Sequence, residues 1–157
     1  MTHARTIVIV TLGVVLSMLL ARSAFAAEAE QRLINEKDLK WTTAPDGSKY
    51  AVLLGDPRQA GPYVMRVISL PGDKVLPHWH SQDEYITVLS GTVHIGLGDK
   101  FDPSKAQALH AGGFYFLPGK THHYMIIKTR SLMQVSGNGP IDMTYVDPAD
   151  DPKNAKR

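Results

Sequence analysis

Residues 72–91 read GDKVLPHWHSQDEYITVLSG, and this stretch decides how the rest of the chain is interpreted. It places His78, His80 and Glu84 within seven residues, with a glycine at each end of the stretch. Side chains two positions apart on a β-strand point to the same side, so both imidazoles are expected to face one way. Two imidazoles and a carboxylate suit Mn, Fe, Co, Ni, Cu or Zn, and the chain has no cysteine that would favour a softer metal. The stretch therefore predicts a strand end that binds one divalent transition metal.

A second pair of histidines follows the turn PGKTHH, residues 118–123. Neighbouring residues of a strand point to opposite faces, so only one of His122 and His123 is expected to face the metal. The residues alone leave that choice open. His94 and His110 have no ligand partner at a useful spacing and are expected to be surface or hydrogen-bonded structural histidines.

The rest of the chain has the pattern of an all-β protein. Short runs rich in β-branched and aromatic residues are each closed by Gly, Pro, Asp or Asn, which predicts a β-sandwich or a β-barrel. In residues 92–97, Val93, Ile95 and Leu97 alternate with polar or small residues, which predicts a strand with one buried face. Residues 102–109 have some helical propensity. The predicted strands are 50–54, 63–70, 84–89, 92–97, 114–117, 124–128, 131–137 and 143–146.

The first 26 residues have the features of an export signal. An almost unbroken apolar run extends over residues 7–20, and Ala24 and Ala26 supply the small residues that a signal peptidase recognises. The run is shorter than the ~20 residues that span a bilayer, although an uncleaved anchor is the alternative. We expect a signal peptide over 1–26 cut after Ala26, a lead-in over 27–40, a β-domain over 41–147 and a tail over 148–157. The product would be periplasmic or secreted and would keep no membrane segment.

Cleavage after Ala26 would leave 131 residues with 15 basic and 15 acidic side chains, because Arg5 and Arg22 are removed with the leader. A nearly neutral domain argues against nucleic acid as a partner, since binding to phosphates needs a basic excess. No Gly-rich phosphate loop and no Ser-His-Asp or Cys-His set is present, so covalent hydrolysis is not expected.

The spacing Gly72-x5-His78-x-His80-x3-Glu84-x6-Gly91 resembles the first motif of the cupin superfamily at every position. Gly112-x5-Pro118 followed by His123 resembles the second motif. The resemblance implies an antiparallel jelly-roll barrel, or double-stranded β-helix, with the metal inside. It also implies that the ligands are His78, His80, Glu84 and His123, and it suggests a homodimer.

The second motif departs from the family pattern at two positions. Lys120 stands where the family usually has glycine, and Ile127 stands where it often has asparagine. These departures bear on the conformation of the turn and so on the choice between His122 and His123, for which the family spacing favours His123. Tyr85, Tyr115 and Tyr124 are candidates for lining a pocket, although aromatic residues on strands are more often part of a core.

Two functions from different classes agree with this pattern. The resemblance to cupins implies a metal-dependent oxygenase, isomerase or lyase that acts on a small molecule. The alternative is a non-catalytic periplasmic module that binds or senses a metal or a ligand. No catalytic residue beyond the metal ligands can be named from the sequence.

Overall fold

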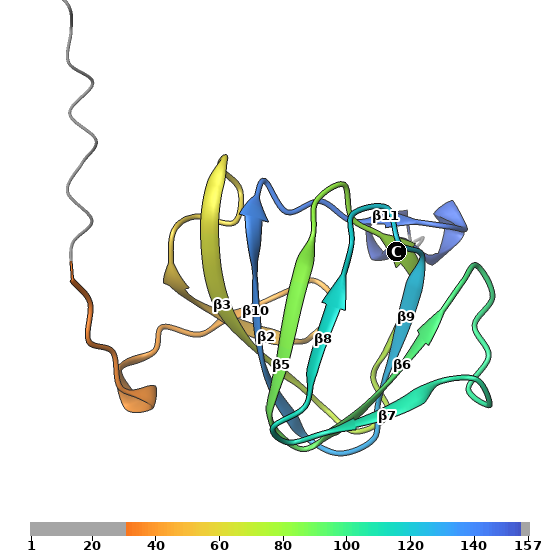
Figure 1. Cartoon of the computed structure of the whole chain (residues 1–157), viewed down its shortest axis with the longest axis horizontal. Coiled ribbons are helices and arrows are strands. Elements are labelled where there is room, and N and C mark those ends of the chain that lie inside the picture. Colours follow the sequence, from red (N-terminus) through yellow and green to blue (C-terminus); the bar gives the residue numbers. More distant parts are fainter. Residues whose placement is uncertain (1–30, 155–157) are drawn as a thin grey trace, which may run out of the picture. The chain divides into compact units, whose positions relative to one another are not determined.

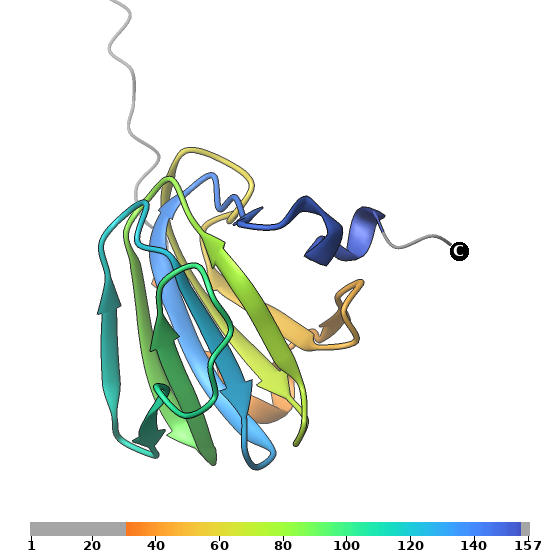
Figure 2. The ribbon, with the colours of Figure 1, turned by 90° about the vertical axis from the view of Figure 1, so that its right-hand side faces the viewer.

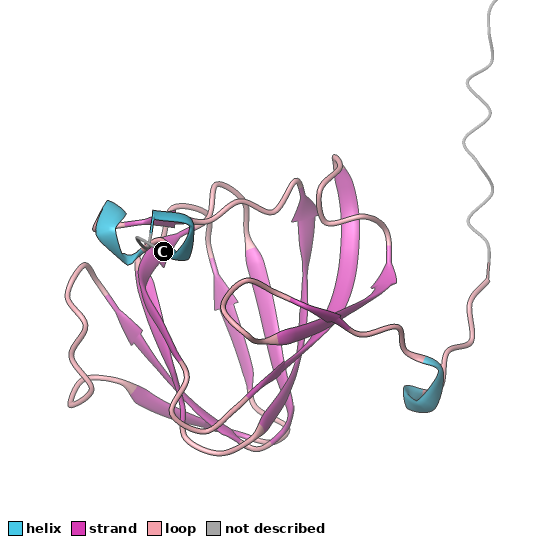
Figure 3. Ribbon diagram, turned by 180° about the vertical axis from the view of Figure 1, so that it is seen from behind, coloured by secondary structure: helices cyan, strands magenta, loops and turns pink. Residues whose placement is uncertain are grey.

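The computed structural model describes residues 31–154, which form two facing antiparallel β-sheets (Figures 1 and 3). The strands are β1 (Thr42–Thr43), β2 (Lys49–Leu54), β3 (Gly61–Ser69), β4 (Lys74–Trp79), β5 (Glu84–Ser90), β6 (Thr92–Leu97), β7 (Gln107–His110), β8 (Phe114–Leu117), β9 (His123–Ile127), β10 (Ser131–Gly139) and β11 (Thr144–Tyr145). One sheet has the order β1-β2-β3-β10-β5-β8 and the other has the order β11-β4-β9-β6-β7. This is the cupin-like jelly roll that the sequence predicts.

All eight predicted strands are present, and their ends differ from the prediction by at most two residues. The helical propensity of residues 102–109 is not realised: a turn closed by the Lys105 amide on the Asp102 carbonyl leads into β7. β7 pairs with β6, from Thr92 opposite His110 to Ile95 opposite Gln107. Pairing along a sheet edge therefore outweighs the local helical preference.

The core lies between the two sheets. One sheet contributes Tyr63, Ile86, Val88, Leu117, Met133 and Val135, and the other contributes Val93, Ile95, Met125 and Ile127. Val93 and Ile95 are buried as predicted, but Leu97 is 63% exposed. The neighbouring Gly96 is buried there instead, because the Tyr124 ring lies against its backbone.

The turn between β5 and β6 requires the last glycine of the 72–91 stretch. Gly91 has a φ of +86°, and a Cβ atom at this position would lie 2.5 Å from the Arg130 carbonyl oxygen. Only glycine combines this backbone conformation with so close an approach. The turn places β5, which carries Glu84, directly before β6 in the opposite sheet.

The ends of the described chain are short helical turns. A 3-10 turn, η1 (Glu36–Asp38), precedes β1, and two more, η2 (Pro148–Asp150) and η3 (Pro152–Asn154), follow β11 (Figure 2). The predicted signal peptide and its cleavage point lie outside the described residues. Within residues 31–154, none of the helices has the length and apolar character needed to span a membrane.

Candidate metal centre

A β-bulge turns His78 toward the interior of the barrel. Val75 of β4 pairs with Met125 of β9, and His78 pairs with His123, so β4 has one residue more than β9 between these pairs. Val75 faces the interior cavity, and strict alternation from it would point Pro77 inward and His78 outward. The extra residue reverses this alternation, as bulges beside functional sites often do. Pro77, which has no N–H to donate, lies within the bulge.

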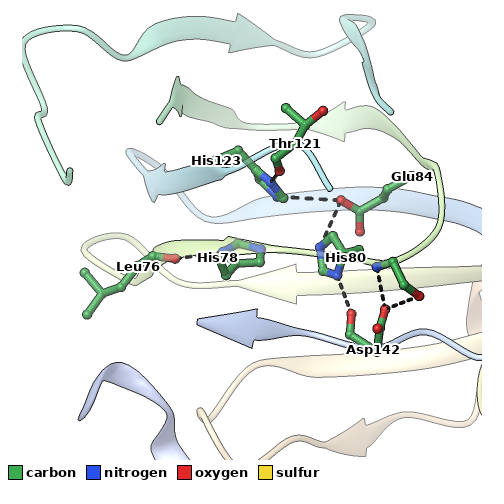
Figure 4. Close-up of polar contacts among 8 residues, drawn as sticks. Leu76, His78, His80, Glu84, Thr121, His123 and Asp142 are labelled. Atoms are coloured by element: carbon green, nitrogen blue, oxygen red, sulfur yellow. Dashed lines mark hydrogen bonds and ion pairs between the residues drawn. The ribbon is translucent and has the colours of Figure 1, made fainter. Parts of the chain in front are cut away.

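Three imidazoles meet at this end of the barrel. His78 is the last residue but one of β4, His80 follows β4 directly, and His123 begins β9. Each offers one ring nitrogen, and the three nitrogens all lie within 4.8 Å of one another. The His78 and His123 rings have centroids 4.1 Å apart, and all three side chains are buried (Figure 4).

The backbone fixes which nitrogen of each ring faces the centre. The Nδ1 atom of His78 lies 2.7 Å from the Leu76 carbonyl, and that of His123 lies 2.9 Å from the Thr121 carbonyl. The Nδ1 atom of His80 makes a short contact with the carbonyl of Asp142. A carbonyl oxygen only accepts, so each Nδ1 carries the proton and donates it. Each Nε2 is then left with a free lone pair, which is the tautomer that a metal ligand requires.

Glu84 brings a carboxylate to the same place. Its Oε2 lies 3.6 Å from Nε2 of His80 and 3.9 Å from Nε2 of His123. Glu84 does not belong to the group of three histidines whose ring nitrogens all lie within 4.8 Å of one another. Glu84 begins β5 and pairs with Gly137 of β10 on one side and with Leu117 of β8 on the other. The carboxylate thus belongs to one sheet and the three imidazoles lie along the other.

Burial shifts the protonation equilibria of these groups toward their neutral forms. It lowers the pKa of His78 to about 3 and that of His123 to about 4, helped by repulsion from the other imidazoles. The hydrogen bonds to the Leu76 and Thr121 carbonyls oppose these shifts. Burial raises the pKa of Glu84, against the opposing attraction of His80. Neutral imidazoles are therefore maintained well below neutral pH, and a cation would offset the cost of ionising Glu84.

The turn of the second motif is tied to the first. Lys120 has a φ of +65°, the left-handed region that favours glycine, so this lysine adopts the conformation associated with the glycine that the family usually has there. The Lys120 amide donates to the His80 carbonyl at 2.7 Å, and the Gly119 amide donates to Oδ1 of Asp83 at 2.8 Å. Asp83 thus helps to hold the turn that precedes His123.

His122 points away from the centre. Its Nδ1 faces a carboxylate oxygen of Asp99 at 2.5 Å, and its ring stacks on Trp79 with centroids 6.2 Å apart. His110 contacts the Thr92 hydroxyl at 3.1 Å, and neither His94 nor His110 belongs to the histidine group. The structure therefore brings together His78, His80 and His123, with Glu84 beside them. Among the described residues, it leaves His94, His110 and His122 outside that group.

A cavity of about 180 Å³ opens beside the three imidazoles. Its walls come from both sheets and from the segment after β10, which contributes Ile141 and Met143. Near the β1–β2 turn it is bounded by Asp46 and Ser48. The site is therefore a small interior pocket with the imidazoles in one wall.

None of the three tyrosines proposed as pocket residues lines this cavity. Tyr85 is 39% exposed and stacks on Phe116, because it alternates with the inward-facing Glu84 and Ile86. Tyr115 lines a different hollow, against β6 and β7. Tyr124 is fully buried and donates its hydroxyl to the Asp102 carbonyl.

Two features of the site were not predicted. The alternation of strand residues could have assigned Ile86 and Met125 to the pocket, since each lies two positions after a predicted ligand. Asp142 was missed because its backbone carbonyl, which any residue would supply, orients a histidine 62 positions earlier. The Asp142 carboxylate also accepts hydrogen bonds from the amide and the hydroxyl of Ser81, at 2.8 and 3.0 Å.

Comparison with known proteins agrees with this arrangement. The sequence profile of the cupin domain matches residues 65–135, a range that runs from β3 to β10 and contains all four predicted ligands. The chain belongs to the cupin superfamily. No curated protein matches this cupin in sequence.

Solved structures share the fold of this cupin at low sequence identity. The polyketide cyclase RemF from Streptomyces resistomycificus is 18% identical with a TM-score of 0.61, and the match covers 78% of this chain and 90% of that one. A candidate acetylacetone dioxygenase from Methylibium petroleiphilum is 15% identical with a TM-score of 0.60, covering 80% and 88%. KdgF from a Halomonas species is 17% identical with a TM-score of 0.57, covering 68% and 94%.

Proposed function

We propose that this cupin holds one divalent transition metal through Nε2 of His78, His80 and His123 and through the carboxylate of Glu84. The observation that carries the proposal is the anchoring of all three Nδ1 atoms to backbone carbonyls, which leaves three Nε2 lone pairs directed at one point. Three imidazoles and one carboxylate fit Mn, Fe, Ni, Cu or Zn. A preorganised set of donors also lowers the cost of assembling the site around the ion.

We propose further that a small molecule binds at this centre and is transformed there by oxygenase, isomerase or lyase chemistry. When bound, the metal supplies Lewis acidity toward an oxygen of the substrate. The described residues orient three ligands, surround them with apolar side chains, and hold Glu84 where burial favours its neutral form. The cyclase and the candidate dioxygenase among the similar structures support small-molecule chemistry.

A second candidate function is a module that binds or senses a metal or a ligand without turnover. One observation favours it: apart from the four proposed ligands, Asp46 is the only acidic or basic side chain that lines the described cavity. Asp46 lies in the β1–β2 turn, where its Oδ1 accepts hydrogen bonds from Ser48. Within residues 31–154, Asp46 is therefore the one acid or base in the cavity wall that is independent of the proposed ligands, and it is already hydrogen-bonded to Ser48.

The metal proposal is tested by elemental analysis of the protein from residue 27 onward, purified without chelators or a metal-affinity column. Near-stoichiometric metal is expected, and it should be absent from the double variant Glu84→Gln, His123→Ala. Water-proton relaxation of the manganese-loaded protein then tests the enzyme proposal, because turnover needs an exchangeable coordination position, and absence of a bound water would count against it. Absence of metal, before and after reconstitution, would refute the metal proposal.

Export stays a proposal based on the first 26 residues. Expression of the full chain in a bacterium should place the protein in the periplasmic fraction with Ala27 at its N-terminus. Retention in the membrane fraction with an intact N-terminus would favour the uncleaved anchor.

A further inference from the structure

Methionines form a large share of the apolar wall of the cavity beside the histidines. The chain has six methionines, and the four that follow residue 26 all line this one cavity: Met65, Met125, Met133 and Met143. Methionine side chains are flexible and polarisable, so they fit around apolar guests of differing shape. Five aliphatic side chains, among them Ile86 and Val135, complete the apolar part of the wall.

Polar groups are confined to particular parts of the wall. The three histidines and Glu84 form one group, and Asp46 and Ser48 lie at the β1–β2 turn, already hydrogen-bonded to each other. Ser69 adds one hydroxyl from β3. No lysine or arginine of the described chain lines the cavity. A ligand with an ionised group away from the histidines would therefore lose water without gaining a counter-charge.

The volume limits the size of the ligand. The cavity measures about 180 Å³, against the ~300 Å³ at the lower end of ordinary ligand sites. At ~30 Å³ for each water-sized volume, it has room for about six non-hydrogen atoms.

We infer that the ligand of this site is a small molecule of about half a dozen non-hydrogen atoms, with a single polar head directed at the metal and an apolar body. This inference rests on the proposed metal site for the position of the head. The apolar body rests on the lining alone. Molecules that carry a second charged group, such as dicarboxylates, are excluded as ligands.

Straight-chain carboxylates from acetate to octanoate provide the test, with calorimetric titration of the cobalt-loaded protein as the measurement. Affinity should rise about fourfold with each added methylene up to a chain of about five carbons, and then stop rising. Glutarate has the same number of carbons as pentanoate and should bind at least about tenfold more weakly. A flat series, or glutarate that binds as well as pentanoate, would overturn the inference.

A pair of variants separates the cavity from general stability. Met133→Ala enlarges the cavity and should move the optimum to a chain about two carbons longer. Leu117→Ala removes a comparably buried core side chain that does not line the cavity, so its optimum should stay at the original length. If both variants shift the optimum equally, or neither does, the cavity does not select the ligand.

Metal content measured on the same samples distinguishes failure of the metal site from failure of this inference. If no cobalt is taken up, the proposed function fails, and benzene binding to the metal-free protein decides the apolar character of the cavity. Saturable binding of benzene that Met133→Ala alters and Leu117→Ala does not would support the apolar body. No binding of benzene would overturn it.

Discussion

The two faces of the β4–β9 strand pair carry the same residue type in opposite settings. On the inner face His78 and His123 are 3% and 2% exposed, and each donates its Nδ1 proton to a backbone carbonyl. Outside, His122 stacks on Trp79, and its Nδ1 faces a carboxylate oxygen of Asp99, whose side chain is 66% exposed. The backbone carbonyls leave Nε2 free and directed inward, whereas the outer histidine is paired with an acid in solvent. The partner of Nδ1 and the degree of burial therefore matter more for the chemistry than the presence of histidine.

The largest expected difference between the two faces is in metal affinity. His123→Gln removes an inward Nε2 ligand and should weaken binding on the order of 100-fold or more, since even the loss of an outer-shell partner costs ~10-fold. His122→Gln, at the neighbouring position, should leave the dissociation constant within about twofold. Competition titration with a chromogenic chelator measures both. Similar losses in the two variants would mean that the inner face is not the metal site.

The pH dependence of stability is the next largest effect. The pKa of His78 is about 3 and that of His123 is about 4 in the folded protein, below the ~6.5 of an exposed imidazole. Below pH ~6.5 the imidazoles of the unfolded chain take up protons, whereas these buried rings do not. Their contribution to the free energy of unfolding is therefore complete above pH ~6.5 and is lost as the pH falls toward 4. The raised pKa of Glu84 acts in the opposite sense. Its contribution to the free energy of unfolding is present at low pH and is lost as the pH rises above the pKa of this carboxyl in the unfolded chain.

The variant Glu84→Gln isolates the imidazole contribution. Metal-free Glu84→Gln protein should lose on the order of 2 kcal/mol of unfolding free energy between pH 7 and pH 5.5. Urea unfolding at several pH values measures it. Adding His122→Gln should leave the slope unchanged, because that ring is on the outer face. A flat profile would contradict the buried, neutral state of the two inner rings.

Asp142 offers a smaller and more specific effect. Its carbonyl accepts from Nδ1 of His80, and its carboxylate accepts from the Ser81 amide and hydroxyl, so the side chain holds the carbonyl in place. Asp142→Ala should weaken metal binding about tenfold and broaden the electron paramagnetic resonance lines of a bound Cu²⁺, because His80 becomes less fixed. Asp142→Asn keeps an acceptor oxygen and should restore both. Failure of the asparagine variant to restore them would show that the charge of Asp142, and not its position, is what matters.

The sequence predicted most of the strands, though not β1 or β7, and it pointed to the three histidines that the fold brings together. Both predictions depend on local patterns. Alternation in β6 placed Val93 and Ile95 in the core, and the spacing of the first motif placed His78 and His80 on one side of their strand. The prediction for Leu97 was wrong: this last residue of β6 is 63% exposed.

Other features depend on contacts between distant parts of the chain. The bulge in β4 is defined by its register against β9, and Pro77 is the one residue within β4 that hints at it. The Asp142 carbonyl reaches His80 only once β10 has paired with β5 and brought the following segment across the barrel. The candidate pocket tyrosines illustrate the same dependence. Alternation from Glu84 puts Tyr85 outside, but the positions of Tyr115 and Tyr124 follow only from the assembled barrel.

The smallest effect is expected on the outer face itself. Asp99→Asn removes the charge that faces His122, and because the pair is solvent-exposed the free energy of unfolding should change by less than ~1 kcal/mol. Metal affinity should not change, although His122 and His123 are adjacent in the chain, because Nδ1 of His123 is held by the Thr121 carbonyl and not by the outer cluster. Thermal unfolding and the chelator titration measure the two quantities. A change in metal affinity without a change in stability would mean that the outer carboxylate acts on the centre through the 121–123 backbone, and the two faces would then have to be treated as one site.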